Sequence, residues 1–159
     1  MLISQYQLLQ DTLEQKLRYW SDSLKDVPAL ELPLDKPRPA VQTFAGETLP
    51  FRLSPQASQS ITELANRFQA TQFMVLLAAY AVLLQRYSGQ DAFAIGTPVS
   101  GRDRPELENI VGFFVNTIAV KVVPDDTDNF EQLLDQVKET VLNGFEHQEV
   151  PFEQIVEEL

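Results

Sequence analysis

The chain has 159 residues, of which 44% are hydrophobic and 22% are charged, so it holds enough apolar material for one domain or one lobe with a core of its own. It has no cysteine, which excludes disulfides, thiolate nucleophiles and cysteine-ligated metals. Because no signal-like apolar segment opens the chain either, a cytoplasmic location is predicted. The longest apolar run, residues 73–84, is shorter than the roughly 20 residues of a membrane span and predicts a buried helix.

The net charge of −11 is concentrated near the C-terminus. Eleven of the 23 acidic residues lie in residues 125–159, where Lys138 is the only basic residue. Such a segment repels phosphate backbones and anionic lipid, so neither nucleic acid nor a membrane is an expected partner. The acidic residues are interpreted either as solvated helix faces or as a surface for a basic partner.

The first third of the chain predicts a helix, a connector and a strand. Apolar residues three and four apart predict an amphipathic helix over residues 4–26, which Pro28 ends. Four prolines predict that residues 28–46 form a stiff extended connector. Residues 47–53 alternate between apolar and polar side chains, and Pro50 within them favours an edge strand.

Two helices are predicted next. Ser54, followed by proline, predicts the start of a helix that ends near Gln69. Thr71 caps a second helix, which ends just before Gly89. The second helix is apolar around its whole circumference, so it is expected to be covered on every side and to form the centre of the core.

The remaining elements complete an α/β pattern. Residues 92–97 predict a buried strand, residues 98–108 a polar loop, and residues 113–123 an alternating strand. Asp128 and Glu131 predict a capping box at the start of a helix that runs to about Glu146. Strands interleaved with helices predict an α/β fold.

A short helix is predicted after Pro151, and the chain then stops on an apolar residue. Its inward side chains are expected to be Phe152, Ile155, Val156 and Leu159. Because no helix-stop signal follows Leu159, we expect a chain truncated within a larger domain.

His147 is the single histidine, and no sequence motif places a nucleophile beside it. A histidine at a helix C-terminus interacts favourably with the helix dipole, so a structural role is favoured over catalysis. One histidine without cysteine does not supply a normal metal shell, and no metal site is predicted.

Three polar residues leave alternatives open. Asn116 shares a strand face with buried residues, so its amide must have partners. It either ties a neighbouring backbone segment, which we favour, or faces a polar cavity. Arg102 and Arg104 either clamp a carboxylate or a chain segment, or are solvated loop charges.

Four segments together resemble the condensation domains of nonribosomal peptide synthetases. Residues 30–39 are similar to the connector of that family, and residues 95–102 to a core strand motif that ends in arginine. Residues 111–117 are similar to its Gly-x-Phe-Val-Asn-Thr motif and residues 147–153 to its His-Gln-Asp-x-Pro-Phe-Glu motif. Tyr19-Trp20 fits the helix ahead of the connector. The resemblance covers nearly the whole chain, with the motifs in the family's order and spacing.

The resemblance implies a fold and a domain division. It implies a truncated lobe like that of chloramphenicol acetyltransferase, with a mixed sheet and packed helices. Residues 1–46 would be the amphipathic helix and Pro-rich connector between two lobes, and residues 47–159 a partial C-terminal lobe. The active site of the family is a tunnel between the lobes, where an acceptor amine attacks a donor thioester to form an amide.

The resemblance also implies where the chemistry lies. The two-histidine catalytic motif of the family is absent from this sequence and belongs to the preceding lobe, so no catalytic residue is assigned here, and the chain alone is expected to be inactive. This lobe would supply tunnel wall. Asn116 would lie nearest the cavity, and Thr117, Ser100 and Arg102 are the other tunnel-lining candidates.

Partners follow from the same resemblance. They are the N-terminal lobe, the adjoining synthetase domains and peptidyl carrier proteins, whose 4'-phosphopantetheine arms bring the substrates. The chain itself is expected to bind no cofactor, and to self-associate through its first helix or a sheet edge. The alternatives are a non-catalytic interaction or scaffolding module, or a variant of the same fold that epimerises, cyclises or esterifies.

Overall fold

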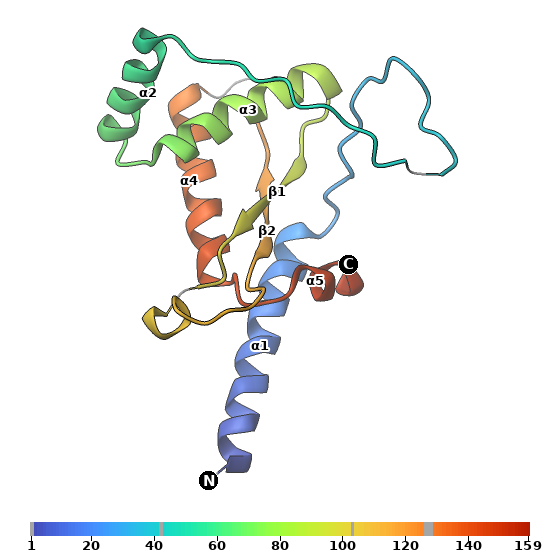
Figure 1. Cartoon of the computed structure of the whole chain (residues 1–159), viewed down its shortest axis with the longest axis vertical. Coiled ribbons are helices and arrows are strands. Elements are labelled where there is room, and N and C mark those ends of the chain that lie inside the picture. The colour runs from blue at the N-terminus through green and yellow to red at the C-terminus, as the bar shows by residue number, and fades with distance from the viewer. Residues whose placement is uncertain (1, 42, 103, 126–128) are drawn as a thin grey trace.

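The computed structural model describes residues 2–41, 43–102, 104–125 and 129–159, and side chains from residue 12 onward (Figure 1). The described residues contain five α-helices and a small sheet, which confirms the predicted α/β class. The elements are α1 (Leu2–Leu24), α2 (Pro55–Arg67), α3 (Gln72–Ser88), β1 (Phe93–Val99), the 3-10 turn η1 (Pro105–Leu107), β2 (Asn116–Val122), α4 (Phe130–Glu146) and α5 (Phe152–Glu158).

The core forms where α4 packs on the sheet. Strands β1 and β2 are antiparallel, with Phe93 opposite Val122 and Val99 opposite Asn116. Helix α4 packs on β2, α3 packs on α4 and α2 packs on α3, while α1 and α5 contact each other and β2 (Figure 1). The predicted inward face of β2 is confirmed, because Ile118, Val120 and Val122 are buried.

The helix termini follow the capping signals in the sequence. The Ser54 hydroxyl accepts a hydrogen bond from the Ala57 N–H at 3.1 Å, and the Thr71 hydroxyl accepts one from the Met74 N–H at 3.2 Å. Gly89 ends α3 with a left-handed φ of 68°. The capping box of α4 is formed by Asn129 and Gln132, one residue later than predicted; Asp128 lies outside the described residues.

The predicted strand over residues 47–53 is wrong. This segment has no regular structure, and Leu49 and Phe51 are 88% and 83% exposed. Alternation alone does not make a strand, because a strand needs a neighbour to share its backbone hydrogen bonds. None of the described residues pairs with this segment.

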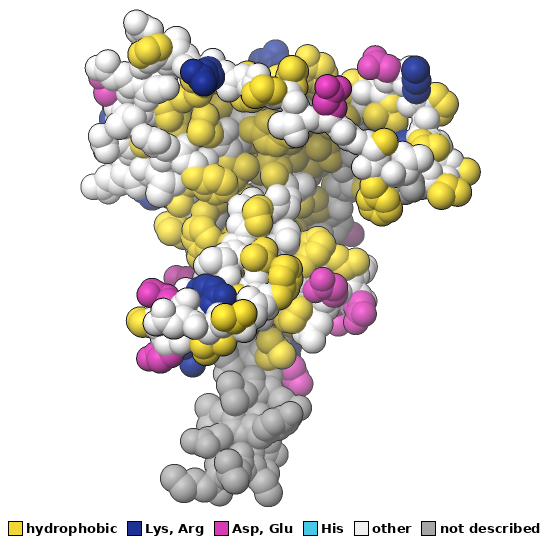
Figure 2. Space-filling view, viewed as in Figure 1, with side chains coloured by type: hydrophobic (Ala, Val, Ile, Leu, Met, Phe, Trp, Pro, Cys, Tyr) yellow, Lys and Arg dark blue, Asp and Glu magenta, His cyan; other side chains and the backbone are white. Residues whose placement is uncertain are grey.

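The prediction that α3 is covered on every side is also wrong. One side is buried in the core, but the other is a stripe with exposed fractions of 42% to 64%. This stripe, called the α3 stripe below, comprises Phe73, Leu76, Tyr80, Leu83 and Tyr87. Figure 2 shows hydrophobic side chains gathered over the upper half of the molecule, where α3 lies.

The short helix α5 follows the prediction in part. Ile155 is buried and Phe152 is half-buried, as expected, but Val156 and Leu159 are exposed. In the described part of the chain, no single helix is both long and apolar enough to cross a membrane; only α2 and α3 taken together, with a bend of 108° between them, have that length and composition.

Candidate functional site

A cavity of about 670 Å³ lies between the start of β2 and the turn that precedes α5, and is called the β2 cavity below. Its walls come from three separate parts of the sequence. They are Gly101, residues 113–117, and a C-terminal group consisting of Gln148, Glu149, Pro151, Phe152 and Glu153. The cavity therefore has aromatic and aliphatic walls with two carboxylates.

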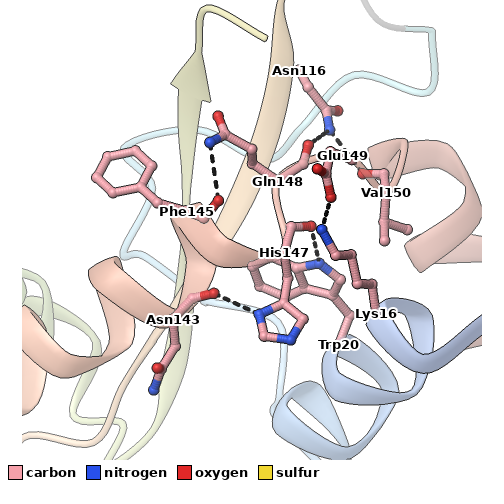
Figure 3. A network of polar contacts seen from close by, with 9 residues as sticks. All are labelled: Lys16, Trp20, Asn116, Asn143, Phe145, His147, Gln148, Glu149 and Val150. Atoms are coloured by element: carbon pink, nitrogen blue, oxygen red, sulfur yellow. Dashed lines mark hydrogen bonds and ion pairs between the residues drawn. The ribbon is translucent and has the colours of Figure 1, made fainter. Parts of the chain in front are cut away.

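Asn116 holds one wall of the β2 cavity in place (Figure 3). Its side-chain Nδ2 donates hydrogen bonds to the carbonyl oxygens of Gln148 and Val150, both at 2.7 Å. Its Oδ1 accepts a hydrogen bond from the Phe152 N–H at 3.1 Å. The predicted backbone tie is confirmed, and the same residue also lines the cavity.

His147 begins the segment that Asn116 holds, residues 147–152, called the 147–152 turn below. His147 caps α4, and its Nδ1 lies 2.7 Å from the carbonyl oxygen of Asn143. Because a carbonyl only accepts, Nδ1 carries the proton of this hydrogen bond. The imidazole stacks on the Tyr19 ring, with 3.8 Å between the ring centroids and 17° between the planes.

Helix α1 contacts the 147–152 turn at two further points (Figure 3). The Trp20 indole Nε1–H donates a hydrogen bond to the carbonyl oxygen of His147 at 3.0 Å, and the Trp20 side chain is only 1% exposed. Lys16 forms an ion pair with Glu149, one of the two carboxylates of the cavity wall. The structural interpretation of His147 is thus supported by contacts from two helices.

Arg102 clamps a chain segment, which was one of the two alternatives. Its guanidinium donates to the carbonyl oxygens of Leu107 and Gly112, and lies 4.2 Å from the centroid of the Phe114 ring. Such a cation over an aromatic face is attracted by the ring quadrupole. Arg104 is exposed, as expected of a solvated loop charge.

The four tunnel-lining candidates fall into two pairs. Asn116 and Thr117 line the β2 cavity, whereas Ser100 and Arg102 are not among its lining residues. The Ser100 hydroxyl instead accepts a hydrogen bond from the Arg102 N–H at 3.3 Å. The residue between them, Gly101, does line the cavity.

The sequence did not reveal that Gly101 or the Tyr19-Trp20 pair would contact the site. Gly101 has a left-handed φ of 63°, and a Cβ at this position would overlap the carbonyl oxygen of Phe114. A glycine followed by two arginines in a polar loop was the available signal. For Tyr19-Trp20, the signal was an aromatic pair on one helix that also needed polar partners.

The hydroxyl of Tyr19 has a raised pKa. Burial raises the pKa of its hydroxyl, and the nearby carboxylates of Glu139 and Glu146 raise it further; a hydrogen bond with Ser23 acts in the opposite direction. The pKa shift therefore favours the neutral phenol.

No group of three His, Cys, Asp or Glu side chains with a metal-binding arrangement occurs among the described residues.

Comparison with known proteins identifies the class of the chain. Residues 3–159 match the family model of the condensation domain, so the chain belongs to the condensation-domain family. It is 43% identical to gramicidin S synthase 2 of Aneurinibacillus migulanus over 94% of this chain, and 43% identical to tyrocidine synthase 2 of Brevibacillus parabrevis, also over 94%. The chain spans only 3% and 4% of the length of these relatives.

Solved structures agree with this assignment. A four-domain nonribosomal peptide synthetase, holo-AB3403, matches with a TM-score of 0.87 and 38% identity over 90% of this chain and 11% of that one. The X-domain from teicoplanin biosynthesis matches with a TM-score of 0.88 and 27% identity over 99% of this chain and 36% of that one. The resemblance in sequence and the predicted α/β fold class are both confirmed, although the described residues form a two-stranded antiparallel sheet and not the expected mixed one.

Proposed function

We propose that this chain is part of the condensation domain of a nonribosomal peptide synthetase, which joins a carrier-bound acyl or peptidyl donor to a carrier-bound aminoacyl acceptor through an amide bond. The observation that carries the proposal is that segments resembling separate condensation-domain motifs meet at the β2 cavity. Residues 111–117 and 147–153 are two of the segments that resemble condensation-domain motifs, and side chains from both line this cavity. Gly101, from a third such segment, lies in the same wall.

In this proposal the chain supplies wall and not catalytic groups. Asn116 and Thr117 face the substrate tunnel, while Ser100 and Arg102 hold the loop that carries Gly101. The two-histidine catalytic motif of the family belongs to another part of the synthetase. Residues 1–46 connect the two lobes, and residues 47–159 are part of the second.

The proposal also names partners. The donor and acceptor arrive on the 4'-phosphopantetheine arms of peptidyl carrier proteins, and the chain itself binds no cofactor. Adjoining synthetase domains and the N-terminal lobe are its permanent neighbours. The acidic segment, residues 125–159, would favour basic over acidic partner surfaces. A cytoplasmic location belongs to the same proposal.

The test uses donor and acceptor carrier proteins loaded with amino acids, with the dipeptidyl thioester detected by mass spectrometry. The synthetase that contains this chain is expected to form the dipeptide, and the 159-residue chain alone is expected to form none. Turnover by the chain alone that is abolished by His147→Ala would contradict both the division of labour and the structural role of His147.

Asn116→Leu is the sharpest substitution for this proposal. It removes two donors and one acceptor from partly buried backbone groups, so we expect a loss of about 1–3 kcal/mol in the free energy of unfolding, together with a loss of condensation activity in the synthetase. Thr117→Val changes the same cavity wall but leaves the hydrogen bonds of Asn116 in place, so it is the control for the stability measurement alone. Chemical denaturation of the chain and the dipeptide assay measure the two effects; unchanged values in both would contradict the assigned tie.

A non-catalytic interaction module remains the second candidate. The observation that favours it is the match to the X-domain from teicoplanin biosynthesis, which has also been solved in complex with OxyB. Identity to that domain is 28%, compared with 38% to the four-domain synthetase, so we favour the synthetase. A synthetase that forms no dipeptide, yet binds a second protein through this domain, would reverse the preference.

A further inference from the structure

We propose that His147 is a positioning residue for the β2 cavity: it sets the place of the 147–152 turn, and through that turn the place of the wall that Asn116 holds. The inference rests on the proposed function for its consequence in catalysis, but not for its structural part. His147 does not line the cavity and touches no reacting group, so its effect must act through the residues that follow it.

His147 is held by three contacts. Its ring is fixed on one edge by the hydrogen bond from Nδ1 to the Asn143 carbonyl, and on one face by the Tyr19 ring. Its backbone is fixed by the hydrogen bond from the Trp20 indole to its carbonyl oxygen. These three contacts come from α4 and α1, and they determine both the position and the direction of the chain where it leaves α4.

The position of His147 controls the residues of the turn that follow it. Gln148, Glu149, Pro151 and Phe152 follow directly and form the C-terminal wall of the β2 cavity. Asn116 reaches this wall from β2 and needs the carbonyls of Gln148 and Val150 at hydrogen-bond distance. The 147–152 turn is therefore held at two places, at its start by the contacts of His147 and at Gln148 and Val150 by Asn116. A shift at His147 disturbs the geometry of the hydrogen bonds to Asn116.

The side chain at position 147 must do two things at once. It donates a hydrogen bond to a carbonyl four residues earlier, one that the end of α4 leaves without a helical partner, and it presents a flat face to Tyr19. Phenylalanine keeps the stacking and loses the donor, asparagine keeps a donor and loses the stacking, and alanine loses both. These three substitutions separate the two contacts.

The structural half of the test uses the 159-residue chain and nuclear magnetic resonance. Trp20 is the only tryptophan, so its indole N–H gives a single resonance. Proton exchange of the Asn116 side-chain amide reports the hydrogen bonds to the turn. His147→Ala is expected to shift the indole resonance and to speed exchange of the Asn116 amide about tenfold, with His147→Phe and His147→Asn in between.

The control separates a local effect from a general loss of stability. Val75→Ala opens a core position on α3, away from the turn, and urea brings wild type and variants to the same free energy of unfolding. If Asn116 exchange rises as much in Val75→Ala as in His147→Ala under these conditions, the positioning role is wrong. If His147→Ala fails to fold, the comparison is made with His147→Phe, which retains the stacking.

The functional half uses the full synthetase. A misplaced cavity wall should impair binding of the carrier-borne substrate, so His147→Ala is expected to raise KM roughly tenfold or more, with a smaller change in kcat and partial rescue by His147→Phe. Faster Asn116 exchange with unchanged KM and kcat would overturn the link to catalysis. A wild-type synthetase that makes no dipeptide would instead contradict the proposed function and leave the exchange result standing.

Discussion

At Gly101 the chain requires the absence of a side chain. The residue has a left-handed backbone conformation, and an added Cβ would overlap the Phe114 carbonyl oxygen and lie 2.9 Å from the carbonyl carbon. Close approach of these two backbone segments brings the Ser100–Arg102 loop against the residues that open β2. A single missing methyl group therefore shapes one edge of the β2 cavity.

Gly101→Ala should accordingly cost more stability than an ordinary glycine substitution. Gly89→Ala is a matched control, because Gly89 has nearly the same φ, 68°, but has open space around its Cβ position. We expect about 1 kcal/mol of destabilisation for Gly89→Ala from backbone strain alone, and roughly 2 kcal/mol or more for Gly101→Ala. Equal midpoints in urea denaturation would contradict the close approach.

Tyr19, on α1, makes the free energy of unfolding depend on pH in the alkaline range. Burial, helped by Glu139 and Glu146, raises the pKa of the folded-state phenol above its unfolded value of about 10. The folded state thus binds the proton more tightly. Its contribution to stability is complete below pH 10 and is lost as the pH rises through the folded-state pKa.

Tyr19→Phe tests this dependence, since phenylalanine retains a ring for His147 to stack on and has no proton to lose. The pH range from about 9.5 to about 11 brackets the pKa of tyrosine in the unfolded chain. In this range the free energy of unfolding should fall less steeply with pH in Tyr19→Phe than in wild type. Urea denaturation at several pH values measures the two slopes. A steeper fall in the variant would show that the sign of the pKa shift is wrong.

At the scale of elements, local signals in the sequence were sufficient for the helices. Ser54 and Thr71 cap α2 and α3 as predicted, and Gly89 ends α3. These signals work because each is a contact between residues three or four apart. The Asn129 cap of α4 was displaced by one residue from the prediction because acidic and amide side chains that can cap a helix stand next to each other there.

A single substitution removes the cap of α2. Ser54→Ala removes the acceptor for the Ala57 N–H and should lower the free energy of unfolding by about 1 kcal/mol. Ser60→Ala, at an exposed position within the same helix, should change it by less than roughly 0.5 kcal/mol. Differential scanning calorimetry of both variants would compare them, and a larger effect at Ser60 would contradict the capping assignment.

Features that depend on distant partners could not be predicted in the same way. The alternation of Leu49, Phe51 and Leu53 is a genuine strand pattern, but sequence does not state whether a neighbouring strand is available. Asn116 was expected to bond backbone, yet its partners lie more than 30 residues away. The family motifs indicated which segments matter, and the structure was needed to show that three of them share one cavity.

At the scale of the whole molecule, the α3 stripe matters because it is an apolar surface that the described residues leave exposed. Among the described side chains of α1, Leu13 is the large apolar residue with notable exposure, 36%. The α3 stripe is larger and lies on a helix whose only charged residue is Arg86. We therefore expect self-association of the chain to use α3 in place of the first helix or the sheet edge.

Leu83→Lys on the α3 stripe should weaken this association, and Leu142→Lys on α4 should not. The two leucines are matched, because they are 51% and 48% exposed. Static light scattering of wild type should show a larger apparent mass at high salt, since screening reduces the repulsion between acidic segments and leaves apolar contact in place. A monomeric wild type at high concentration and high salt, or equal effects of the two lysines, would contradict this surface.

The connector between α1 and α2 gives the molecule an unusual response to trypsin. Apart from Lys25, which directly follows α1, the connector has Lys36 and Arg38, which each precede proline, where trypsin cleaves poorly. The exposed cutting point between these prolines and α2 is therefore the bond after Arg52. A cut there leaves residues 1–52 attached without a peptide bond. Trp20 still holds the carbonyl of His147, and the Gln90 side chain still bonds the backbone of Ala29 and Glu31. The nicked protein should migrate as two bands on a denaturing gel and as one particle in gel filtration. That result would mean that noncovalent contacts hold the two pieces together after the peptide bond is cut.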